Sequence, residues 1–381
     1  MDPLFICPRC GNSNQRYIGH LNNKMYCRRC IAFNGEEAEA SEDHDIDSVL
    51  DLDYDLSDEQ KELSNQLIGL INEGKHVLIH AVTGAGKTEI VYQLIKLGLE
   101  NHLKIGVAIP RRDVVIELAR RFVSAFPHAT VNAVYGGHHH ILDGDIIILT
   151  THQIYRYIAY FDRLVVDEYD AFPFKNNDVL ETFLMRSLRG QLVAMSATPS
   201  KAMLEKFSKE NHHILHLYTR YHRHPLPVPQ VVRCPLLMQF LMTLKMIKIY
   251  AKAKKPLLIF VPTIARGESL FRWINYFIKG GALAHSQIDK RQEIVEAFRQ
   301  KKFDFLVSTS ILERGITLLN LQVIIFNADH GLFDEATLLQ MAGRVGRKSL
   351  APTGEVIFLS KRKTKSMIGA INQTNHANSF L

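Results

Sequence analysis

Long apolar runs are missing from this sequence. Its longest apolar pieces, such as residues 146–149 and 257–261, have the length of strands, whereas a helix that crosses a membrane needs about 20 apolar residues. The chain also does not start with the basic residues and apolar core of a signal peptide. We therefore expect a cytoplasmic protein with no transmembrane segment, for which any association with the inner face of the cell membrane is peripheral.

Cysteine is scarce, and its placement argues against a disulfide-stabilised fold. Four of the five cysteines form two CxxC pairs, Cys7 with Cys10 and Cys27 with Cys30, separated by 16 residues. This spacing suits a tetrahedral zinc ion held by four thiolates, and four protein ligands leave no open position for catalysis. Residues 1–35 are therefore expected to form a structural zinc module.

Basic and aromatic residues surround the cysteine pairs, among them Arg16, Arg28, Tyr17 and Tyr26. This composition is compatible with a surface that binds phosphates and stacks bases. A surface that docks another protein is equally compatible with it. His20 lies between the pairs and is interpreted as a surface residue.

Lysine and arginine are absent from residues 36–59, which hold 12 acidic residues. We interpret this segment as a solvated linker, and the alternative is that it mimics DNA and covers a basic groove. The rest of the chain is consequently more basic than the net charge of +7 indicates. Such a surplus favours a polyanionic partner, since each Lys or Arg placed on a phosphate releases condensed counterions.

Strand-length apolar runs alternate with helix-length amphipathic stretches from about Lys61 onward, which is the pattern of parallel βαβ construction. Prolines at 225, 227 and 229 predict a hinge without regular structure at residues 218–230. The sequence thus predicts an α/β fold with two tandem doubly wound parallel-sheet lobes, residues 60–217 and 231–381. The predicted strands are residues 76–80, 104–109, 145–149, 163–166 and 191–195 in the first lobe, and 257–261, 282–285, 303–307, 323–326 and 355–359 in the second.

A phosphate-binding loop is predicted after the first of these strands. Residues 81–88, with the sequence AVTGAGKT, follow a strand and open a helix. Glycines let backbone N–H groups turn toward phosphates, Lys87 reaches the β and γ oxygens, and Thr88 binds Mg²⁺. The residues assigned to nucleotide binding in this loop are Thr83, Gly84, Ala85, Gly86, Lys87 and Thr88.

Two carboxylates stand at the end of a later buried strand. Asp167 can hold Mg²⁺, and Glu168 can orient and deprotonate an attacking water. At the end of the next strand, the hydroxyls of Ser196 and Thr198 are candidates for a hydrogen-bonded link between the ATP end of the first lobe and the second lobe.

Two arginines three residues apart are predicted to lie on one side of a helical turn in the second lobe. Arg344 and Arg347 follow Gln340 in the sequence QMAGRVGR. Guanidinium groups delivered across a cleft stabilise the charge of a transferring phosphoryl group, an effect worth about 10³ to 10⁵ in rate. We assign all three residues to catalysis.

In this order, the motifs resemble those of superfamily-2 helicases, from about Leu56 to the C-terminus. The resemblance implies two RecA-like lobes with one ATP site between them, and it implies that Gln60 reads adenine. Residues implied to couple contact with the nucleic-acid strand to ATP hydrolysis are Ser196, Thr198, Glu313, Arg314 and Gly315. Residues implied to contact nucleic acid are Pro110, Arg111, Arg112, Gly136, Gly137, Thr150, Thr151, Pro262, Thr263, Thr309 and Ser310.

Three features together resemble the ComFA family of bacterial late-competence helicases. They are the acidic box at residues 167–173, the sequence ERGIT at residues 313–317, and a four-cysteine module before the first lobe. The resemblance implies a motor that uses ATP to pull single-stranded transforming DNA through a membrane channel of the ComEC type. It also implies a partner of the ComFC type, and the cofactors would be ATP, Mg²⁺ and Zn²⁺.

Other functions remain as alternatives. Replication-restart helicases are similar in layout, but they carry their zinc cysteines inside the second lobe. RNA helicases of the DEAD-box group have similar lobes but are disfavoured by Tyr169 and by the cysteine module. A non-catalytic nucleic-acid adaptor is opposed by the presence of every catalytic position. Outside these motifs, residues 138–140 are interpreted as an exposed histidine loop and Cys234 as a core thiol.

Overall fold

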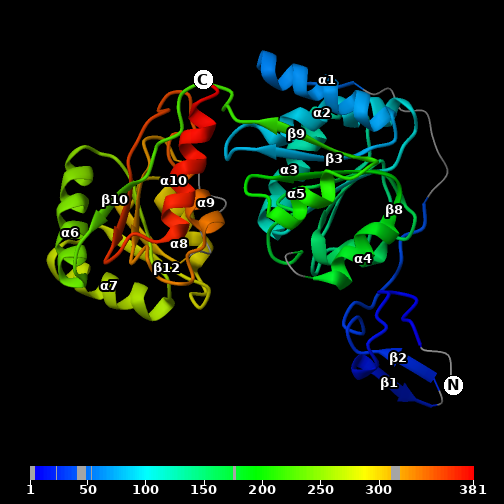
Figure 1. Cartoon of the computed structure of the whole chain (residues 1–381), viewed down its shortest axis with the longest axis horizontal. Helices are drawn as coiled ribbons and strands as arrows, with labels where there is room; N and C mark the ends of the chain where they lie inside the picture. The colour runs from blue at the N-terminus through cyan, green and yellow to red at the C-terminus, as the bar shows by residue number, and fades with distance from the viewer. Residues whose placement is uncertain (1–4, 23, 41–48, 53, 175–176, 310–317) are drawn as a thin grey trace. The chain divides into compact units, whose positions relative to one another are not determined.

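The computed structural model describes residues 5–22, 24–40, 49–52, 54–174, 177–309 and 318–381. The chain divides into two compact units (Figure 1). The first comprises residues 1–81 and 86–217, and the second comprises residues 82–85 and 218–381.

The cysteine module at the start of the first unit is built on a β-hairpin. Strands β1 (Ile18–Leu21) and β2 (Lys24–Cys27) pair antiparallel after the short 3₁₀ helix η1 (Gln15–Tyr17). One CxxC pair precedes this hairpin, and the other starts at Cys27, the last residue of β2.

The core of the first unit is a parallel sheet of seven strands in the order β5-β6-β4-β7-β8-β3-β9. The central strands β4 and β6 are buried along their whole length, which explains their uninterrupted apolar sequences. The strands are β3 (His76–Ala81), β4 (Ile105–Ile109), β5 (Val131–Val134), β6 (Ile146–Thr150), β7 (Phe161–Val166), β8 (Leu188–Ser196) and β9 (His212–Leu217).

Helices connect the strands of this sheet. Helix α1 begins with a capping box in which Ser57 and Gln60 bond each other's backbone N–H groups, and α2 begins directly after Gly86, whose φ of 79° favours glycine. The helices are α1 (Asp58–Asn72), α2 (Lys87–Glu100), α3 (Arg112–Ala125), η2 (Thr151–Arg156), α4 (Asp178–Ser187) and α5 (Lys201–Phe207).

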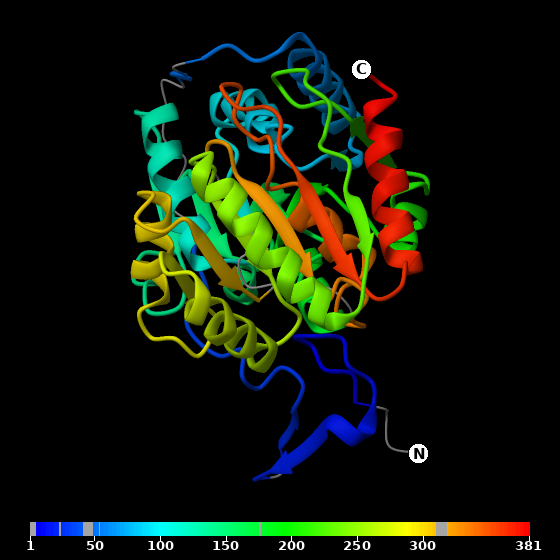
Figure 2. The same cartoon turned by 90° about the vertical axis from the view of Figure 1, so that its left-hand side faces the viewer.

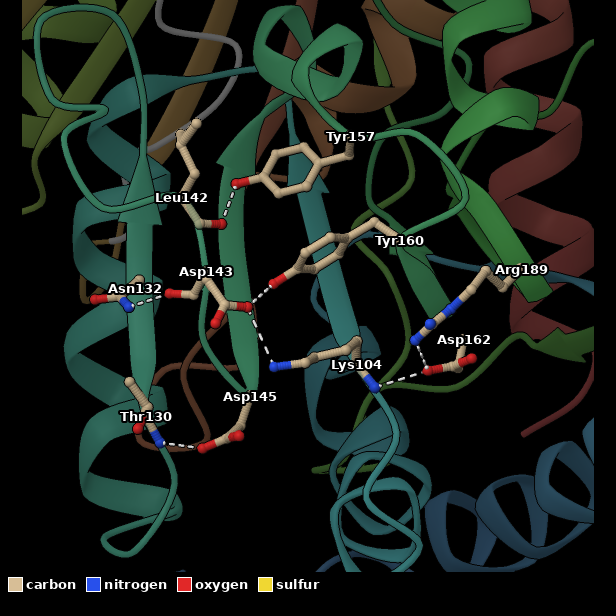
Figure 3. A network of polar contacts seen from close by, with 10 residues as sticks. All are labelled: Lys104, Thr130, Asn132, Leu142, Asp143, Asp145, Tyr157, Tyr160, Asp162 and Arg189. Carbon is tan, nitrogen blue, oxygen red and sulfur yellow. Dashed lines mark hydrogen bonds and ion pairs between the residues drawn. The ribbon is translucent and has the colours of Figure 1, made fainter. Parts of the chain in front are cut away.

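A polar network joins the strands at their amino ends (Figure 3). The buried Lys104 ammonium lies 3.1 Å from Asp143 Oδ1, and the Tyr160 hydroxyl donates to the same carboxylate. Asp162 accepts from the Lys104 backbone N–H at 2.9 Å and from Arg189 at 2.8 Å. The network fixes the register of β4, β6 and β7 at the edge opposite to the loops described below.

The second unit has a parallel sheet of six strands in the order β10-β15-β14-β11-β13-β12. Helices α6 and α7 pack on one face, where α6 lies in front of the strands and runs along them (Figure 2), while α8, α9 and α10 pack on the other. The strands are β10 (Gln230–Arg233), β11 (Leu257–Phe260), β12 (Gly281–Ala284), β13 (Phe305–Ser308), β14 (Gln322–Phe326) and β15 (Val356–Ser360). The helices are α6 (Leu236–Lys252), α7 (Ile264–Phe277), α8 (Arg291–Arg299), α9 (Glu335–Ala342) and α10 (Lys365–Asn378).

The predicted fold class of two doubly wound parallel-sheet lobes with a four-cysteine module is confirmed. Each of the ten predicted strands overlaps an observed strand. In the two large sheets, strands β5, β9 and β10 were not predicted, and all three lie at the edge of a sheet. The hairpin strands β1 and β2 were not predicted either.

Candidate ATP and nucleic-acid site

The predicted phosphate-binding loop connects the carboxyl end of β3 to the start of α2. Gly84 and Gly86 have φ angles of 83° and 79°, in the left-handed region where other residues are strained. Lys87 is the first residue of α2, and its Nζ lies 3.1 Å from the Ala81 carbonyl oxygen. The loop therefore directs a helix N-terminus and an ammonium group at the same place, as phosphate binding requires.

Gln60 lies beside this loop. Its side chain is buried at the start of α1, and its Oε1 accepts from the Ser57 N–H at 3.0 Å. A Cβ atom on Gly86 would collide with the Gln60 amide. The proposed adenine-reading residue is thus packed against the phosphate-binding loop.

The predicted acidic pair follows β7. The Asp167 backbone N–H donates to the Ala108 carbonyl on β4 at 2.9 Å, and the Glu168 N–H donates to Asp167 Oδ1 at 2.8 Å. Glu168 has a φ of 54°, which is uncommon for a residue other than glycine. Such strain is frequent at functional sites, and the pair lies at the same edge of the sheet as the phosphate-binding loop.

Thr198 connects the loop after β8 to the acidic box. Its Oγ1 donates to Asp170 Oδ2 at 2.7 Å, and its backbone N–H donates to Ser196 Oγ at 3.0 Å. Asp170 was not among the predicted site residues, because a single carboxylate in an acidic box gives no sign of its partner. The structure thus brings Thr198 into direct contact with the acidic box, while Ser196 contacts Thr198.

His80 is a further residue that the sequence did not single out. It pairs with Ser196 across β3 and β8, and its ring lies 5.3 Å from that of His216 on β9. Burial lowers the pKa of His80 to about 4, and the positive charges of His216 and Lys87 act in the same direction. The imidazole is therefore neutral at physiological pH.

The other half of this sheet carries the predicted nucleic-acid contacts of the first unit. Pro110 and Arg111 follow β4, Gly136 and Gly137 follow β5, and Thr150 ends β6. The order β5-β6-β4 places these three loops next to one another at the carboxyl edge. Of the predicted contacts here, Arg112, Gly136 and Gly137 are exposed, whereas Thr150 and Thr151 are buried.

In the second unit, Pro262 and Thr263 follow β11, and Thr309 follows β13. These strands are neighbours, so the two loops start side by side. Thr263 caps α7 by accepting from the Arg266 N–H at 3.2 Å. Four predicted residues lie outside the described part of the chain: Ser310, Glu313, Arg314 and Gly315.

Arg344 and Arg347 lie in the turns that follow α9, because the helix ends at Ala342. Arg347 Nε donates to the Gly343 carbonyl at 2.8 Å. Gln340 lies inside α9. The side chains of Gln340 and Arg344 are both buried. The structure thus places the predicted arginines beyond the helix and not within it.

Arg220 braces these turns. Its guanidinium donates to the carbonyl oxygens of Val345 at 2.8 Å, of Gly346 at 2.5 Å and of Gly343 at 3.2 Å. Burial lowers the pKa of Arg220 to about 9, and the charge of Arg347 adds to the effect. The sequence did not reveal this residue, because it lies in the proline-rich hinge and far from the turns it holds.

The four N-terminal cysteines converge. Their sulfur atoms all lie within 4.8 Å of one another and are buried, with Cys7 Sγ 3.6 Å from Cys30 Sγ and Cys10 Sγ 3.7 Å from Cys27 Sγ. Tetrahedral zinc with Zn–S bonds of about 2.3 Å separates its sulfur ligands by about 3.8 Å. The cluster therefore fits a four-thiolate zinc ion. His20 is exposed on β1 and is not part of it.

The segment that leaves the module packs on η2 and α4. The Phe33 ring meets those of Tyr155 and Phe183 edge-on, at centroid distances of 5.7 and 5.3 Å. The Tyr155 hydroxyl donates to the Asn34 carbonyl at 2.8 Å, and Arg186 donates to the Arg9 carbonyl at 2.6 Å. The module is thus attached to η2, which directly follows β6, and to α4, which follows the acidic box.

Cys234 is half-buried, so the prediction of a core thiol was only partly right. Burial raises the pKa of its thiol. In the described part of the chain, no helix has both the length and the apolar character that a membrane span needs.

Comparison with known proteins identifies two helicase domains. Residues 58–207 match the DEAD/DEAH box helicase family, and residues 238–349 match the helicase conserved C-terminal domain. Competence protein ComFA of Bacillus subtilis is 34% identical over 393 residues, which covers 96% of this chain and 84% of that protein. Competence protein ComFA of Streptococcus pneumoniae is 30% identical over 390 residues, with 98% and 90% covered.

Among solved structures, Dbp5 of S. cerevisiae bound to RNA and ADP BeF3 superposes with a TM-score of 0.64 at 15% identity. The match covers 86% of this chain and 88% of that one. At this identity the likeness concerns the fold alone.

Proposed function

Because the chain belongs to the ComFA family and is a superfamily-2, nucleic-acid-dependent ATPase, we propose that it moves along single-stranded DNA and draws transforming DNA into the cell. The supporting observation is that the carboxyl edge of the seven-stranded sheet has two halves with different predicted roles. Loops after β3 and β7 carry residues predicted to bind or hydrolyse ATP, and the loop after β8 carries the predicted coupling residue Thr198. The residues predicted to contact nucleic acid lie after β5 and β4 and at the end of β6. The halves meet where Asp167 donates to Ala108, two residues before Pro110.

The chain's own residues divide the chemistry of the ATP site. ATP supplies the phosphoryl group that water attacks, and Mg²⁺ offsets the charge that develops. Lys87 binds the phosphates, Asp167 holds the metal ion, and Glu168 orients the attacking water. Arg344 and Arg347 stabilise the charge of the transferring group during turnover, and Thr198 transmits the state of the acidic box through Asp170.

The functional division proposed is a zinc module at residues 1–35, an acidic linker at 36–59, lobes at 60–217 and 231–381, and a hinge at 218–230. The proposed partners are a ComFC-type protein and a ComEC-type channel, with the motor on the cytoplasmic side of the membrane where ATP is available. Co-purification of the native protein with each partner tests this part of the proposal. A partner that does not co-purify with the native protein contradicts the proposal for that partner.

Steady-state ATP hydrolysis tests the motor. The purified protein is titrated with single-stranded DNA, duplex DNA and single-stranded RNA of equal length at one salt concentration, because phosphate contacts make affinity salt-dependent. Strong stimulation by single-stranded DNA alone supports the proposal. Preference for RNA assigns the protein to RNA helicases, and preference for duplex DNA contradicts a single-stranded track.

Two substitutions test the roles at the ATP site. Glu168→Gln keeps the shape of the side chain but removes the base, so it is expected to bind ATP and DNA and to hydrolyse at least 10²-fold more slowly. Lys87→Ala is expected to lose nucleotide binding or turnover. Glu205→Gln on the exposed part of α5 is the matched control and should behave as the native protein. Native rates of ATP hydrolysis in Glu168→Gln or in Lys87→Ala would contradict the assignment of the ATP site.

A further inference from the structure

A tight hairpin projects from the carboxyl end of β5. The backbone N–H groups of Tyr135 and His138 each donate to the other residue's carbonyl oxygen at 2.9 Å. Gly136 and Gly137 form the turn between them, and Gly137 has a φ of 82°. A Cβ atom added to either glycine would meet nothing within 4 Å, so the turn borders open space.

Three planar side chains are arranged on this hairpin. The His138 ring is stacked on the Tyr135 ring, with the centroids 4.8 Å apart and the planes inclined by 15°. The Arg112 guanidinium lies over the same tyrosine, 4.8 Å from its centroid. His138 Nδ1 lies 2.9 Å from the Ala133 carbonyl oxygen, which fixes the orientation of the imidazole.

The stack is not part of the hydrophobic core. His138 and Arg112 are exposed, and Tyr135 is half-buried. An exposed ring that is held in one orientation loses little further entropy when a planar ligand stacks on it. The hairpin therefore presents a preorganised aromatic surface at the carboxyl edge of the sheet.

The surroundings of the stack suit a nucleic-acid strand. Arg112 opens α3 directly after the β4 loop, and β6 lies between β4 and β5. Arg111 and Arg112 supply positive charge near the stack, while Asp113, 3.9 Å from Arg111, offsets part of it. A cation beside an aromatic plane is the combination that binds the phosphate and the base of one nucleotide.

We propose that the Tyr135–His138 stack is a base-stacking platform, on which a base of single-stranded nucleic acid lies against the exposed face of His138. Arg112 meets the adjoining phosphate. The inference rests on the proposed function and assigns a role to two residues that no helicase motif includes. The competing view is that the stack serves only to close the hairpin.

Oligonucleotides with and without bases distinguish these views. Fluorescence anisotropy is used to compare a single strand of about 15 nucleotides with an abasic strand of equal length and charge. His138→Ala is expected to weaken binding of the base-bearing strand about 5- to 150-fold and to leave the abasic strand unaffected, since stacking contributes about 1–3 kcal/mol per base. Quenching of a 2-aminopurine base should decrease in the same variant.

Variants of the stack provide the controls. His138→Phe keeps the ring and should retain the preference for bases, and Tyr135→Phe should do the same. Tyr135→Ala should lose it, with an unchanged melting temperature showing that the unit is folded. His140→Ala in the same loop is the matched control, because His140 is exposed and stacks on His139 and not on Tyr135.

The outcomes separate this inference from the proposed function. The platform is overturned if His138→Ala weakens binding of both oligonucleotides equally, or of neither. The motor is still upheld in that case if single-stranded DNA stimulates ATP hydrolysis by the native protein. A native protein that does not distinguish base-bearing from abasic strands overturns the platform as well. Absence of any stimulation by single strands overturns both.

Discussion

The guanidinium group of Arg156 donates a hydrogen bond of 2.9 Å to the carbonyl oxygen of Glu36, 120 residues earlier in the chain. Arg156 Nε donates to Gln153 Oε1 at 2.6 Å, and the Arg156 carbonyl accepts from the Ala38 N–H at 2.8 Å. Arg156 is buried, which shields these bonds from water. One residue thus joins the segment that leaves the zinc module to η2, which begins directly after β6.

Replacing this arginine should loosen the module. Arg156→Met keeps most of the side-chain volume but leaves the Glu36 carbonyl without its donor, at a cost of about 1–3 kcal/mol. Faster amide hydrogen exchange is expected at residues 33–38 and 151–156, together with weaker binding of single-stranded DNA. Arg156→Lys should recover part of the loss, and Lys201→Met on the exposed start of α5 should have no effect. Native exchange rates in Arg156→Met would refute the link.

Zinc should be bound at one ion per chain. Removing two ligands by Cys27→Ser with Cys30→Ser is expected to release the ion, since structural zinc contributes directly to the folding of small modules. Elemental analysis measures the metal, and hydrogen exchange measures the order of the hairpin. Cys234→Ser is the control, because Cys234 is not part of the sulfur cluster. A native protein that is fully folded without metal contradicts the assignment.

Arg220 should act on turnover more than on binding. Arg220→Ala removes one donor from each of the carbonyls of Val345, Gly346 and Gly343, and loosens the turns that carry Arg344 and Arg347. It also removes the donor 3.0 Å from the Thr83 carbonyl in the phosphate-binding loop. We expect kcat to fall about 10- to 100-fold with a smaller change in KM for ATP, because in the proposed mechanism Arg344 and Arg347 act on the transferring phosphoryl group. Arg233→Ala on the exposed end of β10 is the matched control. Equal losses in kcat and in ATP affinity would contradict a role that acts mainly through Arg344 and Arg347.

His80 should make the first unit sensitive to mild acid. Its pKa is lowered to about 4 in the folded chain, against an ordinary value of 6.5, mainly because it is buried. Between these values the unfolded chain binds the proton and the folded chain does not, so the free energy of unfolding falls as pH drops. The expected loss from pH 7 to about pH 5 is about 2 kcal/mol for this residue. The pKa of His76, also lowered by burial, acts in the same direction.

Urea unfolding followed by circular dichroism at both pH values measures this loss. The only tryptophan, Trp273, is in α7 of the second unit, so its fluorescence identifies that unit's transition separately. His80→Gln should lose less stability on acidification than the native protein. An identical pH dependence in the two proteins would exclude His80 as its source.

Local signals in the sequence were sufficient for the interior of both sheets. Strands such as β4 and β6 are buried on both faces, so their apolar runs are continuous and easy to recognise. The edge strands β5, β9 and β10 have half-buried or exposed positions, and β9 reads HHILHL. An edge strand needs fewer apolar residues, which is why the apolar pattern did not reveal these three.

The candidate site shows the same division between local and distant signals. Lys87, Asp167 and the cysteine pairs stand in short motifs whose chemistry depends on neighbours in sequence. Arg156 and Arg220 hold segments more than a hundred residues away, and nothing in their immediate sequence marks them. Their roles follow from the fold and become visible only when it is known.

The position of Phe33 has a practical consequence for dissecting this protein. Its ring covers Tyr155 and Phe183, so a shortened chain that starts after the zinc module would expose both aromatic side chains to water. Exposed apolar surface of this kind promotes self-association, and poor nucleic-acid binding by such a fragment would report on aggregation as much as on a missing contact. Charge substitutions at exposed positions of the module, such as Arg16 and Lys24, separate the two effects because they leave the Phe33 contact in place.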